Sequence, residues 1–194
     1  MTASPSESGA AQVAEKYAAL VGADSSSAEF GTAKIKVPAA RWVEVHRTLQ
    51  AHLPFFSWLS AIDWAAEVAV GDPPEEGVIE RYEVLSRLSD VTTGAGLIVS
   101  TDISKDTPRI ASLTGVFGGA DWHEREAAEM FGIAFEGHPH LTKLYLPDGF
   151  VGYPLRKTFP LLSREVKPWP GTVDVEDMPS SENAEAGDEP EAEA

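Results

Sequence analysis

Apolar residues recur along the chain at spacings that indicate a helix and then a strand. Val13, Tyr17, Leu20 and Val21 fall on one face of a helix, and Gly22 suits the left-handed residue that ends one. The next stretch, "EFGTAKIKVP", has the length and composition of a strand. A short helix followed by a strand therefore opens the folded part of the chain.

A second helical stripe follows Pro38, a residue suited to the first turn of a helix. The stripe consists of Trp42, Val45, Leu49 and Leu53. Pro54 ends it, because proline cannot continue a helix. Such a stripe is typical of a face packed against a core.

Three stretches of strand length come next: "FFSWLSAIDW", "GVIERYEVLSRL" and "GAGLIVSTDI". Each is rich in Ile, Val, Tyr or Trp, and turn-forming stretches separate them, which indicates consecutive antiparallel strands. We therefore predict an α+β fold with a small, mainly antiparallel or mixed sheet, helices on one face, and a long irregular extended C-terminal segment. The pattern does not give the order of the strands.

A last helix is predicted from Asp121 to Gly132. Asp121 suits the N-cap, and Glu124 three residues later completes a capping-box pattern. Gly132 suits the left-handed stop.

Glu124 interrupts the apolar face of this helix, where a carboxylate is costly unless a cation or several donors meet it. We expect Glu124, Arg125 and Glu126 to organise the helix through a polar network that locks it to the chain that follows or to a partner. Arg125 and Glu129 have the spacing of an i,i+4 pair, and we interpret them as an exposed couple of little energetic weight.

The composition suggests where the folded part begins and ends. Residues 1–9 and 172–194 are rich in Ser, Pro, Ala, Gly and Glu, and we expect both to be disordered. The globular domain would span residues 10–132. Residues 133–171 carry too many glycines and prolines for a long element and would form an extended partner-binding segment.

Charge and cysteine content exclude several classes of function. The net charge is -16, with nine of the 31 acids and no base in residues 172–194, a balance that argues against nucleic-acid binding. The absence of cysteine excludes disulfides, thiolate zinc sites and cysteine-ligated iron–sulfur clusters within this chain. No apolar run reaches the roughly 18–20 residues of a membrane helix, and the start lacks the features of a secretory signal, so we expect a cytosolic location.

The sequence lacks the complete motifs of the common catalytic sites. The stretch "HEREA" lacks the second histidine of a zinc-protease helix, because Ala127 stands at that position. No serine elbow or phosphate-cradling loop is present. A metal site remains as an alternative of another class, in which a stand-alone metal-dependent enzyme would use His123, Glu126, His138 and His140.

The segment after the last helix contains a loose repeat, "FEGHPHLTKLYLP" and "FVGYPLRKTFPL". Prolines restrict its backbone, so it can lie along a partner at modest entropic cost. The expected anchors are Phe135, Phe150, Tyr153, Phe159 and Leu161. Arg156 and Lys157 would supply ion pairs to the partner. In the alternative interpretation, the segment folds back over its own sheet.

The stretch "EREAAEMFGIAFEGHPHLTKLYLPDGFVGYPLRKTFPL", residues 124–161, resembles a signature found in respiratory complex I, the NADH-quinone oxidoreductase. The signature is that of its 30 kDa-type peripheral-arm subunit. The general layout of that family covers residues 30–170. The chain departs from the family at His123 and Ala128, where bulky aromatic residues are usual, and at Glu129, where Asp is usual.

The resemblance implies a structural subunit of the peripheral arm, on the cytoplasmic side of the bacterial plasma membrane, that holds no cofactor itself. In such an assembly electrons pass from NADH through FMN and iron–sulfur clusters to a quinone, and the energy drives proton translocation. The chief partner would be the large hydrogenase-like subunit of the quinone site, and membrane contact would come only through the complex. An alternative within the family is the equivalent subunit of a ferredoxin-, F420- or hydrogen-linked membrane oxidoreductase.

On this interpretation the chain contains no catalytic, cofactor-binding or metal-binding residue. The residues expected at a subunit interface or in helix locking are Glu124, Arg125, Glu126, Phe131, Gly132, Phe135, Gly137, His138, Pro139, Phe150, Gly152, Pro154, Leu155, Arg156, Lys157, Phe159, Pro160 and Leu161.

Overall fold

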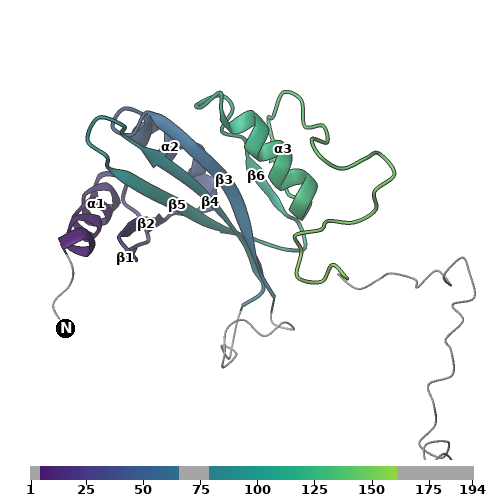
Figure 1. Ribbon diagram of the computed structural model, residues 1–194, viewed down its shortest axis with the longest axis horizontal. Coiled ribbons are helices and arrows are strands. Elements are labelled where there is room, and N and C mark those ends of the chain that lie inside the picture. The colour runs from purple at the N-terminus through teal and green to yellow at the C-terminus, as the bar shows by residue number, and fades with distance from the viewer. Residues whose placement is uncertain (1–4, 66–78, 161–194) are drawn as a thin grey trace, which may run out of the picture. The chain divides into compact units, whose positions relative to one another are not determined.

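The computed structural model describes residues 5–65 and 79–160. The first compact unit of the chain is Met1–Phe159. All helices and strands of the described residues lie in the first unit, an α+β fold built on a mixed five-stranded sheet (Figure 1). This confirms the predicted fold class. None of the described helices is both long and apolar enough to cross a membrane.

The first helix, α1 (Pro5–Val21), ends where the pattern placed its end, at Gly22 with φ of +61°. It begins earlier than predicted, so the expectation of disorder is wrong for residues 5–9. Proline suits the first helical turn, and the alanines that follow favour a helix. The buried side chains of α1 are Ala10, Ala14, Tyr17 and Val21. Leu20, which we placed on this face, is exposed.

The single strand predicted after α1 is one half of a hairpin, β1 (Ser25–Glu29) and β2 (Thr32–Lys36). Phe30 and Gly31 form its two-residue turn with φ of +51° and +71°, the left-handed backbone that such hairpins require. The sequence of β1, "SSSAE", lacks alternating apolar residues, which is why the pattern missed it.

A short 3-10 helix, η1 (Ala39–Arg41), leads into α2 (Trp42–Gln50). The stripe predicted for this helix is buried, with Leu53 completing it just beyond the helix end. Strands β3 (Phe55–Trp64), β4 (Arg81–Ser89) and β5 (Gly96–Ile103) follow. Both consecutive pairs are antiparallel, as predicted.

The strand order is β1-β2-β5-β4-β3, and β2 pairs with β5 in parallel. This pairing joins strands that are separated in the chain by α2, β3 and β4. The hydrophobic core gathers side chains from one face of the sheet and from α1, α2 and the last helix. Its sheet contribution includes Ile35, Leu59, Val84, Leu88, Leu97 and Val99.

A histidine lies inside this core. His46 of α2 is fully buried, with Nδ1 2.7 Å from the carbonyl oxygen of Trp42 and Nε2 2.6 Å from the hydroxyl of Ser86 on β4. A carbonyl only accepts, so Nδ1 donates its proton and Nε2 accepts from the serine. Burial lowers the pKa of His46 to about 4, although the hydrogen bond to the Trp42 carbonyl works in the opposite direction.

The last helix, α3 (Ala120–Phe131), has Gly119 at its N-cap and no side-chain cap. The predicted capping box is therefore wrong, and the carboxylate of Glu124 bonds elsewhere. Gly132 ends α3 as predicted, with φ of +74° and its N–H bonded to the carbonyl of Ala128. Strands β6 (Arg109–Ala111) and β7 (Ala134–Glu136) flank α3 and pair in parallel as a separate two-stranded sheet. Each has three residues, too few for a period to emerge.

The buried His46 makes stability depend on pH. Between about pH 6.5 and 4, His46 is protonated in the unfolded chain but stays neutral in the folded chain. The free energy of unfolding therefore falls as the pH falls. At about 1.4 kcal/mol per pKa unit, this loss reaches about 3 kcal/mol. Urea unfolding of wild type and His46→Gln from pH 7.5 to 4.5 measures it. We expect the stability advantage of the wild type to shrink with acid, and a pH-independent difference would contradict the burial of a neutral imidazole.

The glycine at the end of α3, Gly132, has no free space for a side chain. A Cβ at Gly132 would overlap the guanidinium of Arg156 and the ring of Tyr153, in addition to the strain of the left-handed backbone. Gly22 has a similar φ, but there the nearest atom, Nη1 of Arg41, is 3.7 Å away. We therefore expect Gly22→Ala to cost about 1 kcal/mol and Gly132→Ala about 2–3 kcal/mol in urea unfolding. Equal costs would show that Arg156 and Tyr153 do not press on the helix end.

Candidate interaction site

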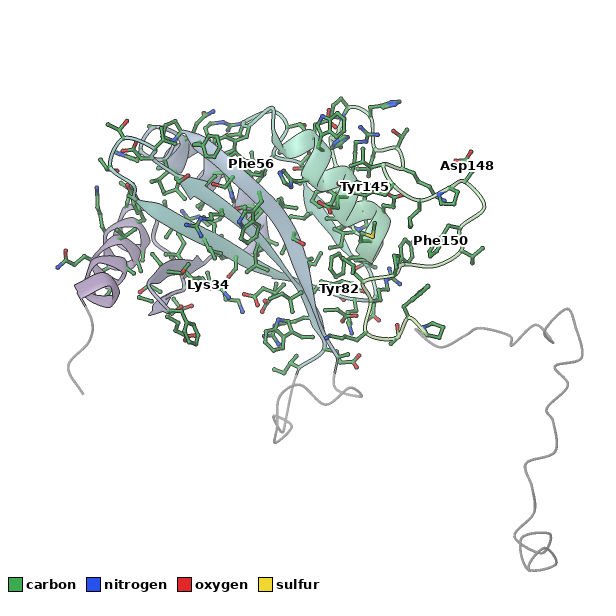
Figure 2. The ribbon with its side chains drawn as sticks, in the orientation of Figure 1. Lys34, Phe56, Tyr82, Tyr145, Asp148 and Phe150 are labelled. Carbon is green, nitrogen blue, oxygen red and sulfur yellow. The ribbon has the colours of Figure 1, made fainter. Side chains whose placement is uncertain are left out.

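After β7 the chain continues as residues 137–159, which we call the strap. The strap contains no helix or strand and runs beside α3 (Figure 1). Figure 2 shows Tyr145, Asp148 and Phe150 on the strap, with Tyr82 near the lower end of the sheet. Most of the residues expected at an interface lie on α3 or the strap, so this pair forms the candidate site.

Glu124 holds α3 in place from its buried face. Its side chain is fully buried, and its carboxylate accepts hydrogen bonds of 2.6 Å from the Ser112 hydroxyl and of 2.6 Å from the Leu113 N–H. Burial raises the pKa of Glu124, while these two donors work against the rise. The expected polar network therefore exists at Glu124. It ties the helix to the segment that follows β6, however, and not to the chain that follows the helix.

Arg125 and Glu129 bind the strap instead of each other. The Glu129 carboxylate accepts hydrogen bonds from the backbone N–H groups of residues 144, 145 and 146 at 2.9, 2.9 and 2.6 Å. Arg125 donates from Nε and Nη2 to the carbonyls of residues 142 and 143 at 3.0 and 3.2 Å. The interpretation as an exposed i,i+4 couple is wrong. We call these two side chains the clamp, because Glu129 accepts from the backbone N–H groups and Arg125 donates to the backbone carbonyls of one strap turn.

The hydrogen bonds of the clamp affect the pKa of Glu129. Burial works to raise the pKa of this carboxyl, but the three N–H donors and the nearby Lys143 ammonium outweigh burial and hold the pKa below its ordinary value. A carboxylate that meets several backbone donors is stabilised in its charged form. Sequence reasoning missed Glu129 as a site residue, because its spacing to Arg125 has a common local explanation.

Lys143 organises the next part of the strap. Its ammonium lies 3.2 Å from the carbonyl oxygen of Pro147, 3.2 Å from that of Asp148 and 3.5 Å from that of Phe150. Three acceptors match the three donors of an ammonium group. Lys143 therefore closes the loop at residues 147–150.

The strap returns to the helix end at Arg156. Its Nε donates to the Phe131 carbonyl at 2.6 Å, and its guanidinium lies 4.0 Å from the centre of the Tyr153 ring. Next to it, the Lys157 N–H donates to the buried carboxylate of Asp63 on β3 at 2.8 Å. These groups were expected to bind a neighbouring subunit. In this chain Arg156 and the Lys157 backbone hold the strap to its own helix and sheet.

Two phenylalanines of the repeat pack against each other. The rings of Phe150 and Phe159 stack with centroids 6.0 Å apart. Gly152 has φ of +100°, and a Cβ there would lie 3.0 Å from the Phe159 ring. Glycine is therefore required where the strap passes its own aromatic ring.

Other predicted site residues have internal roles. Phe131 and Phe135 are buried in the core, so the expectation that Phe135 anchors a partner is wrong. The His138 ring donates from Nε2 to the Asp121 carbonyl at 3.2 Å and accepts the His140 N–H on Nδ1. Leu161 lies outside the described residues. The remaining predicted glycines and prolines are Gly137, with φ of +85°, Pro139 and Pro154 on the strap, and Pro160 directly after it.

The residues of the metal hypothesis are not brought together. His123 lies 4.0 Å from Glu126, whereas the ring of His138 meets Asp121. Within residues 5–65 and 79–160, no group of three or more His, Asp or Glu side chains is placed to hold a metal ion.

Between α3 and the strap lies an open cavity of about 430 Å³. Its lining is formed by Arg125, Ala128, Glu129, Gly132, Ile133, Ala134, Leu141, Thr142, Lys143, Leu146, Phe150, Gly152 and Tyr153. Large apolar side chains of α3 and the strap face solvent: Trp122, Leu141, Tyr145, Val151, Tyr153 and Leu155. Of these, Trp122, Leu141, Tyr145 and Val151 were not among the predicted interface residues. The last three lie on the strap, which has no periodicity from which an outward face can be read.

The clamp can be tested with a neutral isostere. In Glu129→Gln the amide offers one acceptor oxygen and sets an NH2 group against backbone donors, so at least one strap N–H loses its partner. We expect hydrogen exchange of the amides at 144–146 to accelerate by about tenfold or more, which corresponds to about 1.4 kcal/mol of local stability. Glu126→Gln, a partly exposed neighbour on the same helix, is the matched control. Identical exchange in both variants would show that the carboxylate does not hold the strap.

The chain matches the family described as respiratory-chain NADH dehydrogenase, 30 Kd subunit, over residues 35–165. It is 36% identical over 154 residues to an NADH-quinone oxidoreductase subunit from Roseiflexus sp. (strain RS-1), covering 77% of this chain and 82% of that protein. It is 38% identical over 135 residues to the corresponding subunit from Rhodopseudomonas palustris (strain TIE-1), covering 70% of this chain and 62% of that relative's length.

Solved structures agree with these matches. A trypsin-resistant fragment (1–134) of Nqo5 superposes with a TM-score of 0.54 at 25% identity, over 67% of this chain and 97% of the fragment. A chain of the membrane-bound sulfane sulfur reductase, an archaeal respiratory membrane complex, has the same fold with a TM-score of 0.63 at 22% identity, over 78% of this chain and 85% of that one. The chain therefore belongs to the family of the 30 kDa subunit of the respiratory-chain NADH dehydrogenase.

Proposed function

We propose that this chain is a structural subunit, without a cofactor of its own, in the peripheral arm of a proton-translocating NADH-quinone oxidoreductase, and that the strap is its docking surface. The observation that carries the proposal is that the backbone and the side chains of the strap have different roles. Its backbone is held to α3 by the clamp and by Arg156, and Lys143 closes its loop at residues 147–150, while large apolar side chains point to solvent.

A strap held in this way suits binding to another protein. Ordering a free segment of this length on binding would cost conformational entropy, whereas a segment already folded on its helix has lost that entropy beforehand. Tyr145, Val151 and Leu155 are 62%, 88% and 52% exposed. Large apolar side chains exposed along one segment favour its use as a protein interaction site.

The partner we propose is the large hydrogenase-like subunit of the quinone site. FMN, the iron–sulfur clusters and the quinone would be held by other subunits of the assembled complex, because this chain has no cysteine to ligate a cluster. The chain would lie on the cytoplasmic side of the membrane and reach it only through the complex. Its contribution to electron transfer and proton translocation would be architectural.

The proposed docking predicts that charges on the strap surface prevent assembly. We expect Tyr145→Asp combined with Leu155→Asp to leave the melting temperature of the isolated chain within about 3 °C, since both side chains are exposed. Co-purification of the tagged chain with the other peripheral-arm subunits should fall by about tenfold or more, because each change places a charge in an apolar contact. Arg156 and Phe159 are less suitable targets, because they hold the strap to its own chain.

Val91→Asp is the matched control, because Val91 is 76% exposed in the turn between β4 and β5, away from the strap. The control variant should co-purify as the wild type does. NADH-driven quinone reduction in membranes should fall in the double variant and stay at the wild-type rate in Val91→Asp. Normal assembly and activity of the double variant would refute docking through the strap.

A further inference from the structure

We propose that the cavity between α3 and the strap receives a large apolar side chain of the docking partner, with a partner carboxylate beside it. This inference rests on the proposed docking function and specifies the chemistry that the docking partner must present.

The cavity has the size and the walls for such an anchor. Its volume of about 430 Å³ lies in the range of pockets that enclose small ligands, about 300–1,000 Å³. Its apolar walls come from α3, from the chain around β7 and from the strap, and include Ala128, Ile133, Leu146 and Phe150. One aromatic or aliphatic side chain would therefore find contacts on several sides, as anchors in interface pockets do.

The fold itself explains why the cavity is left open. The clamp bridges α3 and the strap with hydrogen bonds, so long polar side chains hold the two segments apart. Beneath the strap the lining consists partly of small residues, Ala128, Gly132 and Ala134. Larger residues at Ala128 or Ala134 would fill the space from within. The chain therefore builds a recess and fixes its walls without occupying it.

The charges around the cavity favour an acidic partner. Arg125 and Lys143 line it. Both donate hydrogen bonds to uncharged strap carbonyls, and neither forms a salt bridge within the part of the chain that the structure describes. On the sheet, by contrast, Lys34 and Lys36 are paired with Glu83 and Asp102 at 2.6 and 2.7 Å.

The lining contains one carboxylate, that of Glu129, and its oxygens are occupied by three backbone N–H groups. Two bases against one acid leave an excess positive charge in a chain whose formal net charge is -16. A carboxylate beside the apolar anchor would meet this local charge, and complementary potentials across an interface favour the correct partner.

A zero-length cross-link tests the charged half of the proposal on the intact complex. A carbodiimide joins a lysine amine to a carboxylate in direct contact, so membranes that contain the tagged chain would be treated and digested for mass spectrometry. We expect Lys143 to be joined to an Asp or Glu of another subunit, within two residues of a large apolar residue. Lys143→Arg keeps the charge and removes the amine, so it should abolish this product.

Three outcomes would overturn the proposal. Lys143 could join only carboxylates of its own chain or of a second copy, it could yield no product while other lysines of the complex react, or the partner acid could lack an apolar neighbour.

Filling the recess tests the apolar half. Ala134 is an exposed residue of β7 that lines the cavity, so Ala134→Trp places a large ring in the recess at an exposed position. Ser26→Trp, at an exposed position of β1 on the far edge of the sheet, is the matched control. We expect co-purification to fall about tenfold for Ala134→Trp and to be unchanged for Ser26→Trp, with similar melting temperatures for both chains.

The results separate this inference from the proposed function. If Ala134→Trp assembles normally while Tyr145→Asp with Leu155→Asp does not, the strap docks but the recess receives nothing, and the inference fails alone. If neither affects assembly, the docking function fails as well. The cross-link uses the unaltered protein, so it decides the question even if Ala134→Trp does not fold.

Discussion

The strap depends on one buried carboxylate. Glu129 accepts hydrogen bonds from three consecutive backbone N–H groups, and this arrangement fixes a turn that has no secondary structure of its own. Buried backbone donors need partners, and a loop that lacks a ladder must obtain them from side chains. A charged acceptor provides stronger bonds than a neutral one and satisfies several donors at once. The conformation of the strap therefore follows from the position of α3.

The position of α3 is fixed in turn from its C-terminal end and its buried face. Glu124 ties the face to the segment after β6 through the Ser112 hydroxyl and the Leu113 N–H. At the C-terminal end, the left-handed Gly132 leaves room for Arg156 to reach the Phe131 carbonyl. Three acidic or basic residues of the stretch "EREAAE" thus have separate tasks: one binds the chain before the helix, and two bind the chain after it.

Of the two interpretations that the sequence allowed, the structure shows the contacts of the strap with its own domain, and binding to a partner stays a proposal. The segment does fold back on its own domain, through backbone hydrogen bonds and the stacked rings of Phe150 and Phe159. The same contacts leave the side chains of Tyr145, Val151 and Leu155 exposed. In a family whose relatives are subunits of a respiratory complex, a preformed surface of this kind favours binding with little further ordering.

The sequence by itself determined the elements with a strong period or a strong stop signal. The stripe of α2, the antiparallel order of β3, β4 and β5, and the ends of α1 and α3 at glycines were all readable, because local backbone preference and burial point the same way there. Glu124 was also readable as a group that needs a donor, since its face was apolar. The identity of the donor was not, because Ser112 is twelve residues away and no local rule connects the two.

Only the tertiary structure decided the rest. The parallel pairing of β2 with β5, the β6 and β7 pair, and the use of Arg125 and Glu129 all join segments that are distant in sequence. Helical spacing says which residues share a face, but side chains long enough to meet each other are also long enough to reach a neighbouring segment. Whether Glu129 pairs with Arg125 or with the strap backbone depends on where the strap lies, and that is set by the packed fold.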